Sequence, residues 1–443
     1  MITFDDRTGP DLGVDAPDYP VREVPRWYRD AKFGCFIHYG LYSVPAWATV
    51  EPATEDQDPY VHHRYAEWYG NTVRIAGSPT WQRHQERYGT GCSYDDLADL
   101  WQAEAFDAQA LVDELVGAGA RYIVPTTKHH DGFCLWDTAT TGFNAVRRGP
   151  RRDLIAELHA ATLRAGARFG VYFSGALDWH VSDFPPIRSD TELFEYRRQD
   201  EFFSRYAAAQ LEELIERFSP AVLWNDIDWP DGGKGRQDYA VAALLHRYYQ
   251  AFPDGVVNDR WGVPFHDFAT REYLDVDGVQ PGVWESTRGL GRSFGYNQAE
   301  DAGHSLSGPA LIRHLVDVVS KNGNLLLNVG PRADGTIPEL QLTALRELGG
   351  WLRRHGEAIF GTRPWLRNGE ASGAPRAYTA GAGRVYVHLL DPAAGSLDLP
   401  PELARPGRVS WLADGAPAEL TDGTVTVPEA LRGAAVAVLS VTP

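Results

Sequence analysis

Apolar residues recur along the middle of the chain at two spacings, and each spacing predicts a different element. Residues 106–116 place their apolar side chains on one face of a helix, and the short apolar run 122–124 follows at once. The same order of amphipathic helix and apolar run recurs at 211–224 and at 312–329. Helices that alternate with continuously apolar strands are typical of parallel sheets that are covered on both faces.

The ends of the predicted helices carry stop signals. Residues 118–122, Ala-Gly-Ala-Arg-Tyr, are echoed by residues 165–169, Ala-Gly-Ala-Arg-Phe, so in both places a glycine ends the helix and a strand follows. Farther along, Ser307 is a predicted N-cap, and Asn322 with Gly323 forms a predicted stop. This many helix–strand units predict an α/β fold, a (β/α)8-like barrel rather than an open sheet.

After Gly356 the pattern changes to short runs, several of them alternating between hydrophobic and polar residues, which Gly, Pro and Asp-Gly turns separate. These runs are residues 383–390, 396–399, 408–412, 423–427 and 435–439. They predict a small C-terminal antiparallel β-sandwich that packs against the barrel. We therefore expect two domains, a catalytic barrel at residues 1–358 and a sandwich at residues 359–443.

Composition and charge exclude some classes of partner. The 443 residues are enough for a barrel and a smaller domain, and the net charge of −18 argues against nucleic acid or an anionic membrane surface as partner. No apolar run reaches the length of a membrane helix. A homo-oligomer remains open.

Cysteine usage and the amino terminus predict the compartment. The three cysteines, Cys35, Cys92 and Cys134, are odd in number and lack metal-ligand spacing, so we expect buried thiols in a reducing compartment. Residues 1–10 lack both a basic region and an apolar stretch, so no signal peptide is predicted. The expected location is the cytoplasm.

Residues 221–230, Ala-Val-Leu-Trp-Asn-Asp-Ile-Asp-Trp-Pro, carry the strongest chemical signal. The apolar start predicts a buried strand that ends in Asp226 and Asp228, because Pro230 cannot continue it. The carboxyl ends of barrel strands are where chemistry is done. Alternation places Trp224 and Asp226 on one face, either toward the lumen or away from it, and a strand-end Asp can also simply cap the next helix.

Histidines close two further predicted strands. His38 ends the run 32–40, and His129 with His130 ends the strand that begins at Tyr122. Because adjacent residues of a strand point to opposite sides, we expect one of His129 and His130 to reach the site and the other to support it. The pair lacks the spacing of a metal site, which favours a hydrogen-bonding role. Three such strand ends predict one catalytic mouth.

These candidates lie within long sequence blocks. The blocks are WYRDAKFGCFIHYGLYSVPAWA (27–48), AEWYG (66–70), TTKHHDGFCLWDT (126–138), RFGVYFSGALDWH (168–180), VLWNDIDWP (222–230), VNDRWG (257–262), VWESTRGLGRSFGYN (283–297) and LLLNVGPRADG (325–335). In this order they resemble the glycoside hydrolase family of retaining α-L-fucosidases, over roughly residues 25–360. The resemblance implies a barrel-like catalytic domain and a β-sandwich, with no metal and no organic cofactor.

The resemblance also implies roles for individual residues. Asp226 matches the position of the nucleophile. Positions that hold the fucose ring are matched by His38, Glu67, Trp68, His129, His130, Tyr172, Trp224 and Arg260. The position of the general acid/base varies in the family, and Glu272 is preferred here because residues 268–273 resemble the acid-bearing segment of related members. Glu285 is the alternative, with a structural role as anchor of Arg288 or Arg292 as the competing interpretation.

The sequence thus predicts a retaining exo-α-L-fucosidase that cleaves terminal α-L-fucosides through a covalent fucosyl–Asp226 intermediate. A related exo-glycosidase acting on α-L-galactose is the nearest alternative, since the two sugars differ by one hydroxyl. A catalytically silent sugar-binding protein and a metal-dependent hydrolase are the alternatives from other classes. Linkage and aglycone stay open.

Overall fold

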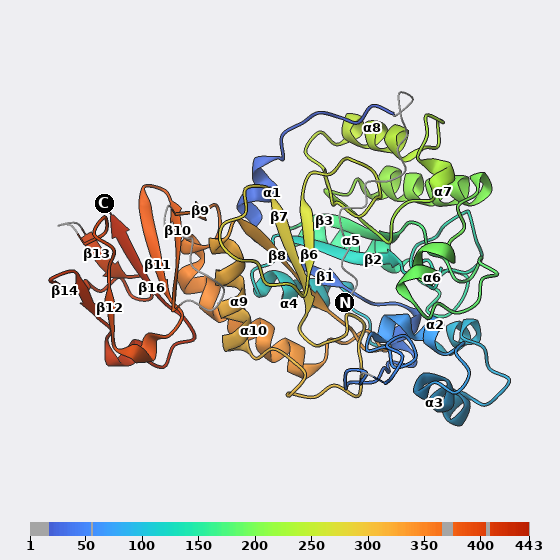
Figure 1. The fold of residues 1–443 in the computed structure, drawn as a ribbon, viewed down its shortest axis with the longest axis horizontal. Helices are drawn as coiled ribbons and strands as arrows, with labels where there is room; N and C mark the ends of the chain where they lie inside the picture. Colours follow the sequence, from blue (N-terminus) through green and yellow to red (C-terminus); the bar gives the residue numbers. More distant parts are fainter. Residues whose placement is uncertain (1–16, 55, 366–374, 405–407, 443) are drawn as a thin grey trace.

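The computed structural model describes residues 17–54, 56–365, 375–404 and 408–442. Among them, eight parallel strands form one sheet in the order β5-β4-β3-β2-β1-β8-β7-β6, at the centre of the larger lobe in Figure 1. A parallel bridge between Asn258, just after β5, and Phe268, just before β6, brings the two edge strands together, so the sheet closes on itself. The predicted (β/α)8-like barrel is confirmed.

The barrel strands alternate with helices, with the exceptions given below. The strands are β1 (Phe33–Ile37), β2 (Tyr122–Lys128), β3 (Arg168–Ser174), β4 (Val222–Asp226), β5 (Val256–Val257), β6 (Ala269–Glu272), β7 (Trp284–Gly289) and β8 (Gly323–Val329). The helices are α1 (Arg26–Ala31), α2 (Tyr69–Thr72), α3 (Pro79–Tyr88), α4 (Ala108–Gly117), α5 (Leu154–Arg164), α6 (Asp190–Glu195), α7 (Glu201–Phe218), α8 (Val241–Ala251), α9 (Gly308–Ser320) and α10 (Glu339–His355).

The predicted helix ends hold. Gly119 after α4 and Gly166 after α5 have φ values of +108° and +74°, and each leads into a strand. Ser307 caps α9 by accepting the backbone N–H of Ala310. The repeat is irregular in one place, because residues 258–268 and 273–283, which join β5 to β6 and β6 to β7, contain no helix.

The two faces of the barrel strands pack into two different clusters of buried side chains. Trp224 belongs to a cluster inside the barrel, whose other members include Phe36, Tyr122 and Tyr172. Its neighbour Leu223 instead belongs to the large core between the strands and the surrounding helices. This alternation settles the open question about β4: Trp224, and therefore Asp226, faces the lumen.

The C-terminal part forms two antiparallel sheets, β13-β16-β11-β10-β9 and β12-β15-β14. Their strands are β9 (Arg363–Pro364), β10 (Arg376–Gly381), β11 (Arg384–Leu389), β12 (Ser396–Asp398), β13 (Arg408–Trp411), β14 (Leu420–Thr421), β15 (Thr424–Thr426) and β16 (Ala437–Thr442). The sandwich lies against α9 and α10 (Figure 1), where Trp351 Nε1 donates to the Val436 carbonyl over 3.0 Å. The sandwich is confirmed, and the boundary after residue 358 stays a prediction.

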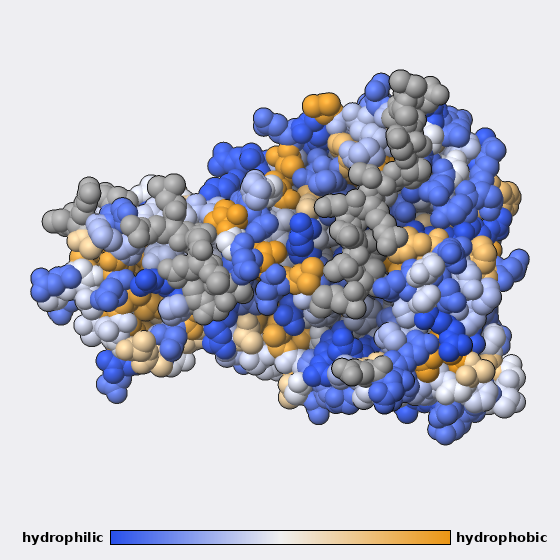
Figure 2. Space-filling model, viewed as in Figure 1, coloured by the Kyte–Doolittle hydropathy of each residue, from blue (hydrophilic) through white to orange (hydrophobic). Residues whose placement is uncertain are grey.

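The distribution of apolar side chains on one face of the molecule and in the described helices bears on whether a segment could span a membrane. Figure 2 shows hydrophobic side chains dispersed among hydrophilic ones on the face it presents. No helix in the described part of the chain combines the length and the apolar character needed to cross a bilayer. Residues 1–10, on which the signal-peptide prediction rests, lie outside the described residues. The three cysteines are free thiols, of which Cys35 and Cys134 are buried and Cys92 is half-buried.

Candidate active site

The candidate residues converge at the carboxyl ends of the barrel strands. Asp226 is the last residue of β4 and Glu272 the last of β6. His38 directly follows β1, His130 follows β2, and Arg260 lies three residues beyond β5. Parallel strands bring all these ends to one rim, so the predicted single mouth is confirmed.

Asp226 is held by hydrogen bonds to both oxygens of its carboxylate. Its Oδ2 accepts the Tyr172 hydroxyl over 2.9 Å, and its Oδ1 accepts the backbone N–H of Ile227 over 2.9 Å. The next helical turn, residues 231–233, begins only after Pro230, so Asp226 is not a helix cap. A carboxylate fixed in this way on the inner face of the rim presents an oriented oxygen to the cavity.

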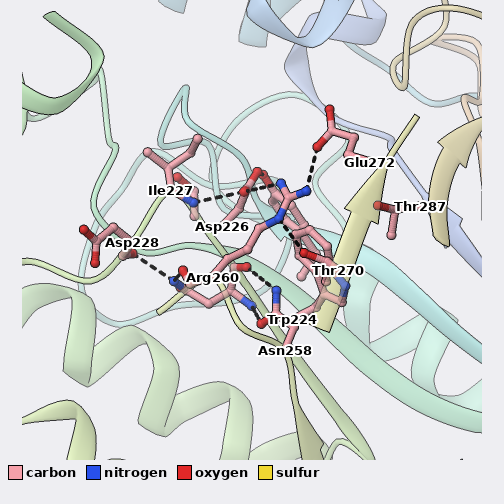
Figure 3. A network of polar contacts seen from close by, with 12 residues as sticks. Trp224, Asp226, Ile227, Asp228, Asn258, Arg260, Thr270, Glu272 and Thr287 are labelled. Carbon is pink, nitrogen blue, oxygen red and sulfur yellow. Dashed lines mark hydrogen bonds and ion pairs between the residues drawn. The ribbon is translucent and has the colours of Figure 1, made fainter. Parts of the chain in front are cut away.

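Arg260 links the two candidate catalytic acids (Figure 3). Its Nη1 donates to Asp226 Oδ1 over 3.0 Å, and its Nη2 donates to Glu272 Oε2 over 2.8 Å. Its Nε donates to Thr270 Oγ1, and its guanidinium carbon lies 4.8 Å from the ring centroid of Trp224. Burial by itself would lower the pKa of Arg260, but Glu272 and Asp226 raise it above its ordinary value. One guanidinium thus fixes both carboxylates at the mouth.

Glu272 has a second partner that the sequence analysis did not identify. The Tyr65 hydroxyl donates to Glu272 Oε1 over 3.1 Å, and the Glu272 side chain keeps 26% of its surface exposed. Tyr65 lies immediately before the AEWYG block, with no spacing or repeat to mark it. Glu272 is thus more exposed than Asp226, whose side chain keeps 12% of its surface accessible.

The histidines line the opposite part of the mouth as neutral rings. His38 Nδ1 lies 2.6 Å from Asn328 Oδ1, and because the Asn328 amide nitrogen donates to Phe294, its oxygen must accept from His38. Burial lowers the pKa of His38 to about 4 and that of His130 well below its ordinary value. His130 Nδ1 pairs with the Ser174 hydroxyl over 2.7 Å, and its Nε2 lies 3.8 Å from Asp226 Oδ2.

The prediction that His129 and His130 point to opposite sides is wrong. Strand β2 ends at Lys128, and a turn follows in which Gly132 donates its N–H to the His129 carbonyl. The two rings therefore lie 4.0 Å apart between centroids, and His129 also stacks on Tyr172 at 5.6 Å. Both histidines face the mouth because strand alternation stops one residue before them.

Glu67 and Trp68 reach the same mouth from the segment after β1. Glu67 Oε2 accepts the Gly295 N–H over 2.8 Å and the Ser293 hydroxyl over 3.1 Å. Burial raises the pKa of Glu67 to about 7. The Trp68 ring lies edge-on to His130 at 5.5 Å. Glu67 and Trp68 therefore join the strand-end residues through Gly295, Ser293 and His130.

Glu285, the alternative acid/base, does not lie at this rim. It is the second residue of β7, near the amino end, and its side chain is fully buried inside the barrel. Its carboxylate accepts the Tyr28 hydroxyl at 2.7 Å, the Tyr122 hydroxyl at 2.5 Å and Trp224 Nε1 at 3.1 Å. It anchors the aromatic floor beneath the mouth, and not an arginine as the sequence suggested.

The buried Glu285 carboxyl predicts a pH effect on stability. Burial raises its pKa from 4.5 to about 7, so between these values the folded chain holds a proton that the unfolded chain has lost. Its contribution to stability therefore falls as pH rises through this window. We expect Glu285→Gln to gain stability relative to the unaltered chain, on the order of 2 kcal/mol between pH 5 and pH 8. Urea unfolding of both proteins at pH 5 and pH 8 measures their free energies of unfolding. If the difference between the two proteins is the same at both pH values, the prediction is wrong.

Metal ligation finds no geometric basis in the described ranges. Within residues 17–54, 56–365, 375–404 and 408–442, no three or more His, Cys, Asp or Glu side chains are grouped so that they could hold a metal ion. The polar groups of the mouth instead bind one another.

Comparisons with known proteins show to which family the chain is similar. Residues 14–357 match the family described as Alpha-L-fucosidase. An Alpha-L-fucosidase of Dictyostelium discoideum is 32% identical over 354 residues, which are 78% of this chain and 73% of that protein. The human Plasma alpha-L-fucosidase is 33% identical over 78% of this chain and 71% of its own length.

Solved structures extend the likeness to almost the whole chain. The Thermotoga maritima alpha-fucosidase in complex with a mechanism-based inhibitor is 43% identical, with a TM-score of 0.86, and the match covers 95% of this chain and 97% of that one. The similarity therefore includes the sandwich as well as the barrel.

Proposed function

This chain belongs to the α-L-fucosidase family and is a glycoside hydrolase, and from that premise we propose that it releases terminal α-L-fucose with retention of configuration. The observation that carries the proposal is the pair of carboxylates, Asp226 and Glu272, bound to the single guanidinium of Arg260 at the mouth. Retaining glycosidases need two such groups about 5–5.5 Å apart on either side of the scissile bond.

In the first step Asp226 attacks the anomeric carbon of the fucoside and Glu272, protonated, gives its proton to the glycosidic oxygen. The bond from carbon to that oxygen breaks, and the aglycone leaves as an alcohol. A covalent fucosyl ester of Asp226 remains. Because Asp226 is neutral in the ester, Arg260 is then free to interact more strongly with Glu272, which is now ionised.

In the second step the oxygen of a water molecule attacks the anomeric carbon while Glu272 takes a proton from that water. The ester bond breaks, and the Asp226 carboxylate is restored. Two displacements, each with inversion, give α-L-fucose as the first product. The structure of the Thermotoga maritima relative is described as a complex with a mechanism-based inhibitor, and this motivates the trapping experiment below.

The neutral histidines and the aromatic floor support sugar recognition. His38 donates through Nδ1 to Asn328, so its Nε2 is left as an acceptor for a sugar hydroxyl. His129, His130, Glu67 and Arg260 supply further polar groups. The rings of Phe36, Tyr172 and Phe294 surround His38, with centroids 5.3, 5.3 and 5.0 Å from its own, and we expect them to form an apolar wall for the 6-methyl group of fucose.

The proposal is tested with a panel of aryl glycosides and a trapping reagent. We expect hydrolysis of aryl α-L-fucoside with α-L-fucose as the first product in proton NMR, and weaker hydrolysis of aryl α-L-galactoside, whose extra hydroxyl must enter the apolar wall. A 2-fluoro-fucosyl fluoride should label a peptide containing Asp226 in mass spectrometry. Inverted product, or a label on another residue, would reject the double displacement, and preference for the galactoside would reassign the substrate.

A further inference from the structure

The turn that follows the Asp226 strand is built from two residues in an unusual backbone conformation. Ile227 and Asp228 have φ values of +55° and +72°. Left-handed φ is uncommon outside glycine, and for a β-branched residue such as Ile227 it is a genuine outlier. Such strain persists only where surrounding contacts over-determine it, and it gathers at functional sites.

The strained turn orients the Asp226 carboxylate directly. It brings the N–H of Ile227 back onto Asp226 Oδ1 at 2.9 Å, and the N–H of Asp228 onto the Arg260 carbonyl at 3.1 Å. The Asn225 amide nitrogen closes the loop by donating to the Asp228 and Arg260 carbonyls, at 2.8 Å each. The segments that follow the neighbouring strands β4 and β5, at Asp226 and at Arg260, are therefore joined through Asp228 (Figure 3).

Two buried cations hold the Asp228 side chain. Lys234 Nζ lies 2.9 Å from Asp228 Oδ1 and Arg197 Nη1 lies 3.3 Å from Oδ2, and the two cationic side chains are only 3% and 1% exposed. Lys234 also pairs with Asp231 over 2.8 Å, whereas in the described part of the chain Asp228 is the one acid that forms an ion pair with Arg197. Buried cations are costly unless they are paired, so the Arg197 segment depends on this carboxylate, and the Lys234 segment depends on it together with Asp231.

The backbone at Gly262 packs directly against the Asp228 carboxylate. Gly262, with φ +63°, faces Asp228 so closely that a methyl group at 262 would lie 1.6 Å from Asp228 Oδ1. Asp228 Oδ1 also accepts the N–H of Trp229 at 2.7 Å. The side chain thus meets four segments of the chain, although the sequence presented it only as a second acid beside Asp226.

We propose that Asp228, clamped by Lys234 and Arg197, is a positioning residue that holds the turn at 226–228 and thereby aims the Asp226 carboxylate and Arg260. The inference rests on the proposed function for its kinetic consequence. Its structural content, that the carboxylate maintains the left-handed turn, is independent of which glycoside is cleaved.

Three substitutions separate charge from backbone strain. Asp228→Asn keeps a residue that tolerates left-handed φ but removes the charge, Asp228→Gly relieves the strain and removes the clamp, and Asp228→Ala keeps the strain and removes the clamp. Because small misplacement of reacting groups is costly, we expect kcat on an aryl α-L-fucoside to fall about 10-fold for Asn and Gly and about 100-fold for Ala. KM should change less than about twofold, since the Asp228 side chain contacts Lys234, Arg197 and the Trp229 N–H and none of the predicted sugar-binding residues.

A matched ion pair controls for general destabilisation. Asp317 on α9 pairs with Lys321, which directly follows this helix, and their side-chain exposures of 21% and 5% are close to the 23% and 3% of Asp228 and Lys234. This pair lies outside the mouth. Asp317→Asn should lower the unfolding midpoint to a similar degree and leave kcat unchanged. Equal kcat losses at both sites would reduce Asp228 to an ordinary stabilising residue and overturn the proposal.

Crystal structures of the Asn and Ala variants provide a readout that does not depend on activity. We expect the bond between Ile227 N–H and Asp226 Oδ1 to lengthen or break, with a shift of Arg260. Variants that keep unaltered geometry at 226–228, or that keep full kcat, overturn the proposal. If the unaltered chain hydrolyses no fucoside, the proposed function fails, and the crystal structures still decide the role of Asp228 in the turn.

Discussion

Asp226→Asn is expected to abolish hydrolysis of an aryl α-L-fucoside, with kcat lower by a factor on the order of 10⁴, while the chain stays folded. The amide cannot form the ester, and its single acceptor oxygen can keep either the Ile227 N–H or the Tyr172 hydroxyl as donor, but not both. Asp226→Gly should be equally inactive in water. With added azide, the Gly variant should convert the fucoside to β-L-fucosyl azide, because a small anion fills the space of the lost carboxylate and a single displacement inverts the centre.

Asp267 offers a closely matched control for this experiment. Like Asp226 it is 8% exposed, and it accepts a tyrosine hydroxyl (Tyr249), a backbone N–H (Val257) and the approach of an arginine (Arg22). It lies before β6, at the amino ends of the strands and away from the mouth. Asp267→Asn should lower the unfolding midpoint and leave kcat near its original value. Near-normal turnover in Asp226→Asn would remove Asp226 from its role.

Much of the scaffold could be predicted because it depends on local patterns. The apolar run before Asp226, the glycines after α4 and α5 and the Ser307 cap each act over a few residues, and all of them hold in the structure. The carboxyl-end rule then placed Asp226 and His38 at one mouth without any knowledge of contacts. Whether Trp224 faces the lumen could not be predicted, because alternation fixes which residues share a face of the strand but not which face lies inside the barrel.

The remaining site features depend on long-range packing. Tyr65 and Glu272 are 207 residues apart, and no spacing in the sequence could pair them. The interpretation of Glu285 failed for a similar reason, since its partners Tyr28 and Tyr122 come from α1 and β2. The orientation of His129 was predicted wrongly for a local reason, because it depends on the exact residue, Lys128, at which β2 ends. Strand ends are determined by the competition between sheet and turn, which pattern alone does not resolve.

Glu272→Ala is expected to lower kcat/KM on fucosides with poor leaving groups by about 10² to 10⁴, the range that a general acid contributes. Aryl fucosides with good leaving groups need little protonation, so their first step should survive while hydrolysis of the ester becomes slow. Azide should then accelerate turnover and give α-L-fucosyl azide, because it attacks the ester from the face that Glu272 occupied. The anomer formed thus separates this variant from Asp226→Gly, which should give the β-azide.

Glu285 supplies the decisive comparison, since it is the other carboxylate considered for this role. Its carboxylate is fully buried and binds Tyr28, Tyr122 and Trp224, so azide has no open space to enter when it is replaced. Glu285→Gln and Glu285→Ala should therefore show no azide-dependent turnover. Their loss of activity should appear as a higher KM, because the substitutions disturb the packing beneath Trp224. Rescue by azide in Glu285→Ala together with its absence in Glu272→Ala would exchange the two assignments. Two carboxylates of the same barrel thus acquire different roles from their depth alone: the one at the rim can meet a leaving group, and the one below it can only hold the floor.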